Sequence, residues 1–136
     1  MGHPRALVDL PASPSAARMA RAVTSAILTG WGLPQVIDDT VLVVSELVHN
    51  AIKHAPGWES YELELVRRPN GIRVYLADGS SLRPVVLELS HDKPSGRGMR
   101  IIETLASSWG SDEYHGGKRV WLDIDTNEPD HEEAAQ

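Results

Sequence analysis

The segment from Leu33 to Ala55 constrains the fold of this chain more than any other stretch. Its apolar side chains recur three and four residues apart, which at about 100° per residue places them on one stripe of an α-helix. In the second half of the segment, the stripe consists of Val44, Leu47, Val48, Ala51, Ile52 and Ala55. A long helix with one apolar stripe must bury that stripe against another layer, so the chain is expected to build a layered domain around it.

Local signals mark both ends of this helix. Pro34 suits the first turn of a helix, and Asp38 and Asp39 put negative charge near the positive end of the helix dipole. Pro56 and Gly57 interrupt the pattern directly after the stripe. The sequence therefore predicts a helix from about residue 34 to residue 55.

The region before this helix predicts one strand and one helix. Residues 6–10 form a short alternating run that is typical of an edge strand. Residues 11–30 predict a helix with Ser13 as its N-cap, Pro14 at its first position and Gly30 as its stop.

The region after the long helix predicts a hairpin, a helix and a last strand. The expected elements are strands at 61–66 and 72–76, a third helix at 99–110 and a strand at 116–124. Asn70-Gly71 joins the first two strands as a strong hairpin signal, and Gly110 is expected to close the third helix. This order predicts the α+β class, with helices gathered on one face of a mostly antiparallel sheet.

Length and composition narrow the class of protein. The 136 residues suffice for one domain, expected over 1–124, whereas 125–136 form an acidic tail with too little apolar content to fold. The absence of cysteine excludes disulfides, thiolate metal sites and thiol catalysis. A net charge of -6 argues against direct nucleic-acid binding. Because no apolar run is long enough for a membrane span or a signal peptide, we expect a cytoplasmic protein without a membrane partner.

Glu46, Asn50 and Lys53 share the helix face opposite the apolar stripe. Taken alone, they fit the solvated face of an ordinary amphipathic helix. They also fit a phosphate site, because Mg²⁺ prefers oxygen ligands and the Asn50 carboxamide could supply one. A carboxylate one turn earlier could accept a proton from a hydroxyl that approaches a terminal phosphate. The helix alone leaves both interpretations open.

Two downstream motifs bear on this choice. The turn that begins at Asp78 follows a predicted strand. A carboxylate fixed there could accept a hydrogen bond from the amino group of adenine. Asp and Gly are also common in turns that have no ligand. In "SGRGMR", Gly96 and Gly98 precede a helix whose free N–H groups favour an anion, and Arg97 and Arg100 add positive charge. Neither the Walker pattern nor the dinucleotide-binding glycine pattern is present.

Four stretches together resemble a known family. They are "ELVHNAIKHA", "LADGSSLRP", "SGRGMRIIETLASSWG" and "GGKRVWLDI". In order and spacing they resemble the bacterial anti-sigma factor and serine-protein kinase family of the GHKL, or Bergerat-fold, ATP-binding superfamily. The resemblance extends from Ser15 to Ile124. It implies a Bergerat-type two-layer α/β sandwich, with a mixed, mostly antiparallel sheet and about three helices on one face.

The resemblance also implies a role for each motif. Glu46 becomes the catalytic base, Asn50 the magnesium ligand, and Asp78 the carboxylate that recognises adenine. The other ATP contacts that it implies are Lys53, His54, Ser80, Pro84, Gly96, Arg97, Gly98, Met99, Arg100 and Arg119. For Lys53 and His54, an ordinary surface position stays open. The family usually has a threonine near the adenine-binding aspartate at the position that Arg119 occupies here.

Three functions follow as hypotheses. The first is an ATP- and Mg²⁺-dependent serine-protein kinase that binds a sigma factor and phosphorylates an anti-anti-sigma partner with a STAS domain. A homodimer is expected, and the face of Arg18 and Arg21 is either its contact, a partner contact or solvated. The second, motivated by Arg119, is a sequestering module without phosphoryl transfer. The third is the catalytic fragment of a sensor histidine kinase, which would need a phospho-acceptor helix from another chain.

Overall fold

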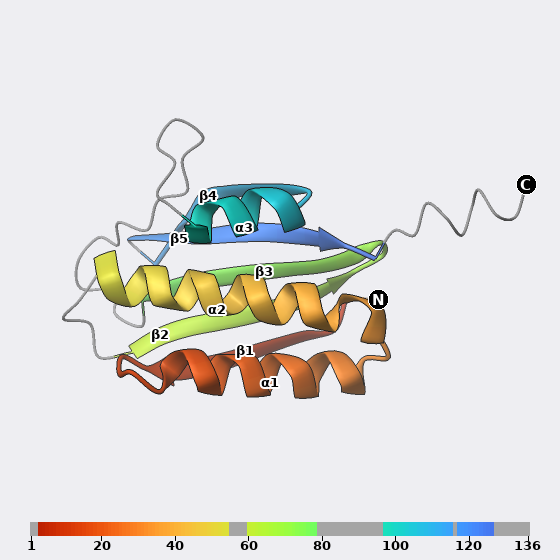
Figure 1. The fold of residues 1–136 in the computed structure, drawn as a ribbon, viewed down its shortest axis with the longest axis horizontal. Helices are drawn as coiled ribbons and strands as arrows, with labels where there is room; N and C mark the ends of the chain where they lie inside the picture. The colour runs from red at the N-terminus through yellow and green to blue at the C-terminus, as the bar shows by residue number, and fades with distance from the viewer. Residues whose placement is uncertain (1–2, 55–59, 79–96, 116, 127–136) are drawn as a thin grey trace, which may run out of the picture.

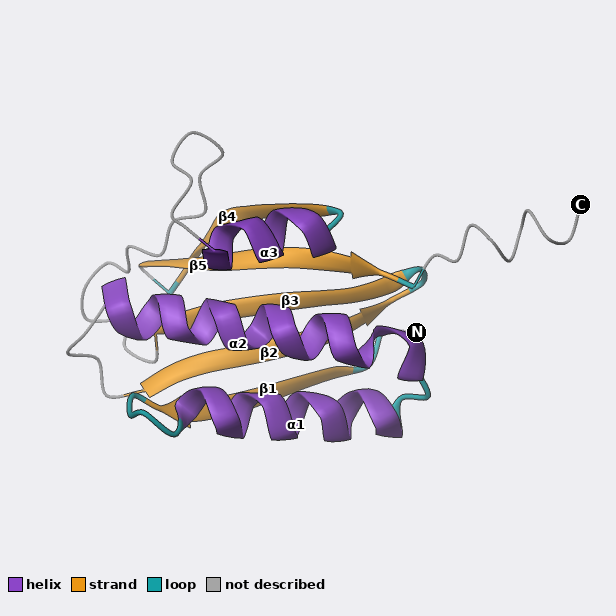
Figure 2. Cartoon of the chain, in the orientation of Figure 1, coloured by secondary structure: helices purple, strands orange, loops and turns teal. Residues whose placement is uncertain are grey.

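The protein is a two-layer α+β sandwich, seen in a computed structural model that describes residues 3–54, 60–78, 97–115 and 117–126 (Figures 1 and 2). In chain order its elements are β1 (Arg5–Pro11), α1 (Ala16–Gly30), the 3-10 helix η1 (Pro34–Val36), α2 (Ile37–His54), β2 (Ser60–Arg68), β3 (Gly71–Asp78), α3 (Arg97–Leu105), β4 (Ser108–Tyr114) and β5 (Gly117–Asp125). The described strands form one sheet in the order β1-β2-β3-β5-β4, and every neighbouring pair is antiparallel. The predicted fold class is confirmed.

The helices lie on one face of the sheet, with α2 between α1 and α3 (Figure 1). Alternate residues of each strand point into the layer between sheet and helices, as the pleat of a strand requires. The largest fully buried side chains are Tyr61, Leu10, Leu28, Leu63, Leu65, Ile72, Leu76, Ile102, Leu122, Ile124, Val43 and Val44. In the described part of the chain, no helix combines the length and apolar character needed to cross a membrane.

The other face of the sheet is not covered by any described helix, and we call it the open face. The side chains that define it are Glu62, Glu64, Arg73, Tyr75, Asp112, Tyr114, Arg119, Trp121 and Asp123. Each of these positions alternates along its strand with the residues that point toward the helices.

The first helix begins later than the sequence predicts. The serine N-cap and proline start were expected at Ser13 and Pro14, but α1 begins at Ala16 after Ser15. Ser13 instead closes a turn, because its carbonyl accepts the Ala16 N–H at 3.0 Å. The helix ends at Gly30 as expected, although the left-handed residue behind it is Gly32, with φ of 72°.

The long helix and the hairpin follow the sequence closely. Pro34 opens the 3-10 turn η1, and α2 then starts at Ile37 with Asp38 and Asp39 in its first turn. The hairpin of β2 and β3 turns at 69–70. Gly71 starts β3 where a Cβ would overlap the Ile124 carbonyl of β5, so only glycine fits this close approach.

The prediction of a helix over 99–110 is wrong in its second half. Helix α3 ends at Leu105, and β4 begins at Ser108 as an edge strand paired with β5. Gly110 does not close a helix. A Cβ there would lie 2.8 Å from the ring of Trp121, so glycine allows the paired strand to pass the indole.

Candidate functional site

Glu46 and Asn50 lie on the flank of α2 that faces away from α1. On the opposite flank, Arg21 of α1 donates a hydrogen bond to the buried Ser45 hydroxyl over 3.0 Å. At 100° per residue, Ser45 lies on one side of the buried stripe of α2, whereas Glu46 and Asn50 lie on the other side. Because α2 lies between α1 and α3, this flank faces the α3 side (Figure 1).

The two side chains are half-buried, and within the described part of the chain neither has a hydrogen-bond or ion-pair partner. A partly buried carboxylate and carboxamide gain more from an incoming ligand than solvated ones do, because part of their hydration is already lost. The described residues contain no cluster of three or more His, Cys, Asp or Glu that could hold a metal alone. A single Asn oxygen suits Mg²⁺ that takes its other ligands from phosphate and water.

The end of β3 lies beneath the last turn of α2. Asp78 is the final residue of β3 and pairs with Tyr61 of β2. The Tyr61 hydroxyl donates to the backbone carbonyl of Ala51, the residue after Asn50, over 3.3 Å. The structure therefore brings the strand end that carries Asp78 close to the helix turn that carries Asn50.

The start of α3 lies at the same end of the sandwich. Helix α3 packs against α2 and runs in the opposite direction, so its first turn lies toward the end of α2 (Figure 1). This turn contains Arg97, Gly98 and Met99, and Arg100 follows with an exposed side chain. The first N–H groups of a helix have no partner inside it and attract anions.

Most of the other predicted contacts lie at the end of α2 or outside the described residues. Lys53 is exposed, and His54 is the last residue of α2. Ser80, Pro84 and Gly96 lie outside the described residues.

Arg119 is not brought together with Glu46 and Asn50. It alternates with the buried Val120 on β5, so its side chain projects from the open face. There its guanidinium lies 3.2 Å from Glu64 and 3.9 Å from Asp112, and it covers the ring of Tyr75 at 3.7 Å. The sequence motif placed Arg119 in the nucleotide site, whereas the structure places it on the far side of the sheet.

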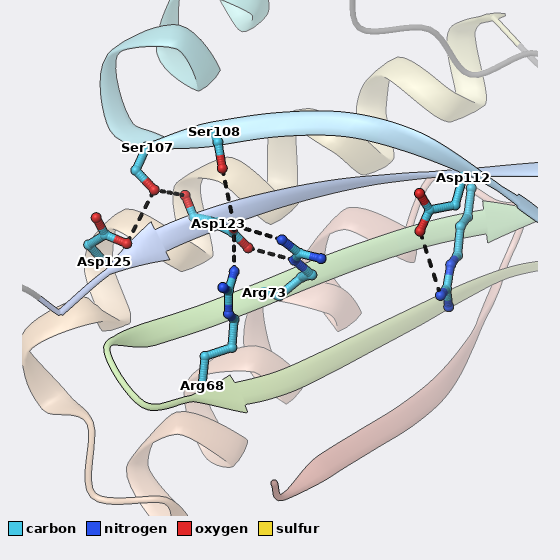
Figure 3. Close-up of polar contacts among 8 residues, drawn as sticks. Arg68, Arg73, Ser107, Ser108, Asp112, Asp123 and Asp125 are labelled. Atoms are coloured by element: carbon cyan, nitrogen blue, oxygen red, sulfur yellow. Dashed lines mark hydrogen bonds and ion pairs between the residues drawn. The ribbon is translucent and has the colours of Figure 1, made fainter.

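A second ion cluster occupies the open face at the other end of β5. Asp123 accepts hydrogen bonds from Arg73 at 2.7 and 2.9 Å and from Ser108 at 3.1 Å, and Arg68 lies 2.5 Å away (Figure 3). Arg73 also covers the Trp121 ring at 4.1 Å. Sequence reasoning missed this cluster, although the alternation of charged and apolar residues along 119–124 was a signal for it.

The pKa values of the open face follow from these contacts. Burial alone would raise the pKa of Asp123, but the hydrogen bonds from Arg73 and Arg68 outweigh it and lower the pKa to about 2. The hydrogen bond from Tyr114 to Glu62, together with burial, raises the pKa of Tyr114 to about 12. Both groups are therefore held in one protonation state across the neutral range.

Comparison with known proteins identifies the family. A profile described as "Histidine kinase-like ATPase domain" matches residues 10–124. The chain therefore belongs to the family of histidine kinase-like ATPase domains, which are ATP-binding domains of the GHKL type. No curated protein sequence matches the chain.

A solved structure shares the fold. It is "The crystal structure of the RsbU and RsbW domains of Rv1364c from Mycobacterium tuberculosis", with a TM-score of 0.64 and 24% identity. The match covers 90% of this chain and 32% of that chain, so this chain spans about a third of its length. At this identity, the likeness shows the fold alone.

Proposed function

We propose that this domain binds magnesium-ATP between the end of α2, the end of β3 and the start of α3, and transfers its terminal phosphoryl group to a serine of a partner protein. The observation that carries the proposal is the flank of α2, where Glu46 and Asn50 are half-buried and have no partner among the described residues. The ATPase family of the chain supports the nucleotide.

In this mechanism each residue has one task. Asn50 would contribute an oxygen to Mg²⁺, which when bound neutralises phosphate charge. Asp78 would select adenine, and the first N–H groups of α3 would hold the phosphates. Glu46 accepts the proton from the serine hydroxyl. As the serine oxygen bonds to the terminal phosphorus, the bond between this phosphorus and the leaving ADP breaks.

The partners follow from the family resemblance in the sequence. We propose that the domain acts in the cytoplasm as an anti-sigma factor, that its phosphoryl acceptor is an anti-anti-sigma protein with a STAS domain, and that it works as a homodimer. The structural neighbour contains an RsbW domain, which is consistent with this proposal. The alternative is a sequestering module without phosphoryl transfer, motivated by Arg119 at the position of the family's usual threonine.

A transfer assay separates the two functions. The domain is incubated with radiolabelled ATP, Mg²⁺ and purified STAS-domain proteins from the organism that encodes it. We expect the wild type to label a serine on one of them. Glu46→Gln should bind ATP within about twofold of wild type and transfer at least about a hundredfold more slowly, because general-base catalysis typically contributes 10²–10⁴. Tight ATP binding without transfer would favour sequestration, and absence of ATP binding would overturn the proposal.

Asp78→Asn tests the adenine end of the site independently. The substitution replaces an acceptor oxygen by an amide donor, so we expect ATP affinity to fall at least about tenfold while GTP binding stays as weak as in the wild type. Equal ATP affinity in the variant and the wild type would remove Asp78 from the site.

A further inference from the structure

Tyr61 is a buried residue of β2 that connects two layers of the molecule. Only 1% of its surface is exposed, and it is among the largest fully buried side chains. Its ring points toward the helices, and its hydroxyl donates to the Ala51 carbonyl of α2 over 3.3 Å. A tyrosine that buries its whole ring normally needs such a partner for its hydroxyl.

The carbonyl that Tyr61 contacts belongs to the last turn of α2. Helix α2 ends at His54, so Ala51 is one of its last four residues and directly follows Asn50. Ala51 is 0% exposed, so water has little access to this carbonyl. The Tyr61 hydroxyl thus caps the end of α2 from below and fixes its last turn against the sheet.

The same residue is tied to the other end of the candidate site. Tyr61 pairs with Asp78 in the antiparallel ladder of β2 and β3. Its hydroxyl contacts the residue that follows Asn50. One residue therefore links the two: its side chain contacts the helix turn of the proposed magnesium ligand, and its backbone pairs with the strand end of the proposed adenine ligand.

We propose that Tyr61 is a positioning residue whose hydroxyl fixes the last turn of α2, and with it Asn50, relative to the end of β3. This inference rests on the proposed function, because it assigns Asn50 to magnesium and Asp78 to adenine. Without the hydroxyl, the Ala51 carbonyl loses this link to β2 and the last turn of α2 loosens. Asp78 keeps its place because the backbone ladder holds it.

Tyr61→Phe removes the hydroxyl and keeps the ring, so the core packing is preserved. Loss of the hydrogen bond to Ala51 should reduce the magnesium-dependent gain in ATP affinity by about fivefold. ATP binding without magnesium should stay within about twofold of wild type. Amide hydrogen exchange of residues 50–54 should also be faster in the variant without nucleotide, because their helical turn has lost its cap.

Ser45→Ala is the matched control. It also removes one hydroxyl that ties α2 to a neighbouring element, but this bond comes from Arg21 on the opposite flank. We expect its magnesium-dependent gain in ATP affinity and its exchange at 50–54 to equal those of the wild type.

The experiment is calorimetric titration of ATP into the wild type, Tyr61→Phe and Ser45→Ala, once with Mg²⁺ and once with EDTA. A selective loss of the magnesium-dependent gain in Tyr61→Phe supports the proposal. An equal loss of ATP affinity in both buffers overturns the proposal, because Tyr61 then acts only on the fold. No loss in either buffer also overturns it, because Tyr61 then has no effect on the site. A wild type that binds no ATP would instead overturn the proposed function itself, so the two failures are distinct.

Discussion

The two faces of the sandwich use polar side chains in opposite ways. On the open face, carboxylates and guanidinium groups pair with each other, as Asp123 does with Arg73 at 2.7 Å. On the helix side, Glu46 and Asn50 are half-buried and have no partner among the described residues. Both faces are rich in polar groups, and the paired groups of the open face contribute to the fold by themselves.

This difference separates two roles that the sequence does not distinguish. A partly buried polar group without a partner loses hydration and regains nothing until a ligand arrives. A paired group stabilises the folded state without any ligand. We therefore expect substitutions on the open face to change stability and substitutions at Glu46 and Asn50 to change binding.

The largest expected effect on stability comes from Asp123→Ala. The substitution leaves Arg68 and Arg73 without their carboxylate, and breaking a buried ion pair costs about 3–5 kcal/mol. Because both arginines are partly exposed, we expect a loss of about 2 kcal/mol in the free energy of unfolding by urea. Glu113→Ala, which removes an exposed carboxylate from β4, should change it by less than about 0.5 kcal/mol. Equal effects would contradict the structural role of the cluster.

Acid should reveal the same carboxylate in the wild type. The pKa of Asp123 is about 2 in the folded protein, below the value of about 3.9 expected for an unfolded chain. The stabilisation is thus fully present above the unfolded pKa and is lost as the pH falls from about 5 to about 2, by about 1–2 kcal/mol. Asp123→Asn should flatten this part of the stability profile, measured by urea unfolding at each pH. An unchanged slope would mean that other carboxylates cause the acid sensitivity.

Arg119→Thr tests whether Arg119 acts on the open face or in the nucleotide site that the family resemblance implies. The substitution removes the ion pair with Glu64 and the stacking on Tyr75, so we expect a destabilisation of about 1 kcal/mol in urea unfolding. ATP affinity, measured by titration, should stay within about twofold. A change of tenfold or more in ATP affinity would show that Arg119 reaches the nucleotide after all.

The smallest expected effect comes from Arg21→Ala on the helix side. Its hydrogen bond to Ser45 is a single, partly buried contact, worth about 0.5–1 kcal/mol in thermal or urea unfolding. Arg18→Ala removes an exposed arginine three residues earlier and should cost less than about 0.5 kcal/mol. Equal costs would mean that the tie between α1 and α2 contributes nothing, and the comparison of paired and unpaired groups would lose one of its cases.

Much of the fold could be predicted because the helical spacing of apolar residues and the turn signals in the sequence are strong. The stripe of α2 and the Asn70-Gly71 hairpin led to the right elements within a few residues. Strand β4 was missed because it is a polar edge strand whose residues 111–113 are all exposed. Such a strand shows no apolar alternation, and it is held by pairing with β5, which no local pattern can reveal.

For the candidate site, the sequence predicts which residues share a face of one helix or strand, but not which elements come together. The spacing of Glu46 and Asn50 shows that they share a helix face, but it cannot show which neighbour that face meets. The position of Arg119 depends on the parity of β5, which is fixed by Val120 in the core. The role proposed for Tyr61 depends on a contact with Ala51, ten residues away across two elements, and no motif records it.

The most direct test of the central claim is titration of ATP with Mg²⁺ into Asn50→Ala, with the unfolding free energy measured on the same preparation. We expect magnesium-dependent ATP affinity to fall by about tenfold or more, on the scale seen when metal-site partners are removed, while stability changes by less than about 0.5 kcal/mol. Unchanged ATP affinity in a variant that has lost stability would contradict this claim, because Asn50 would then belong to the fold and not to a ligand site.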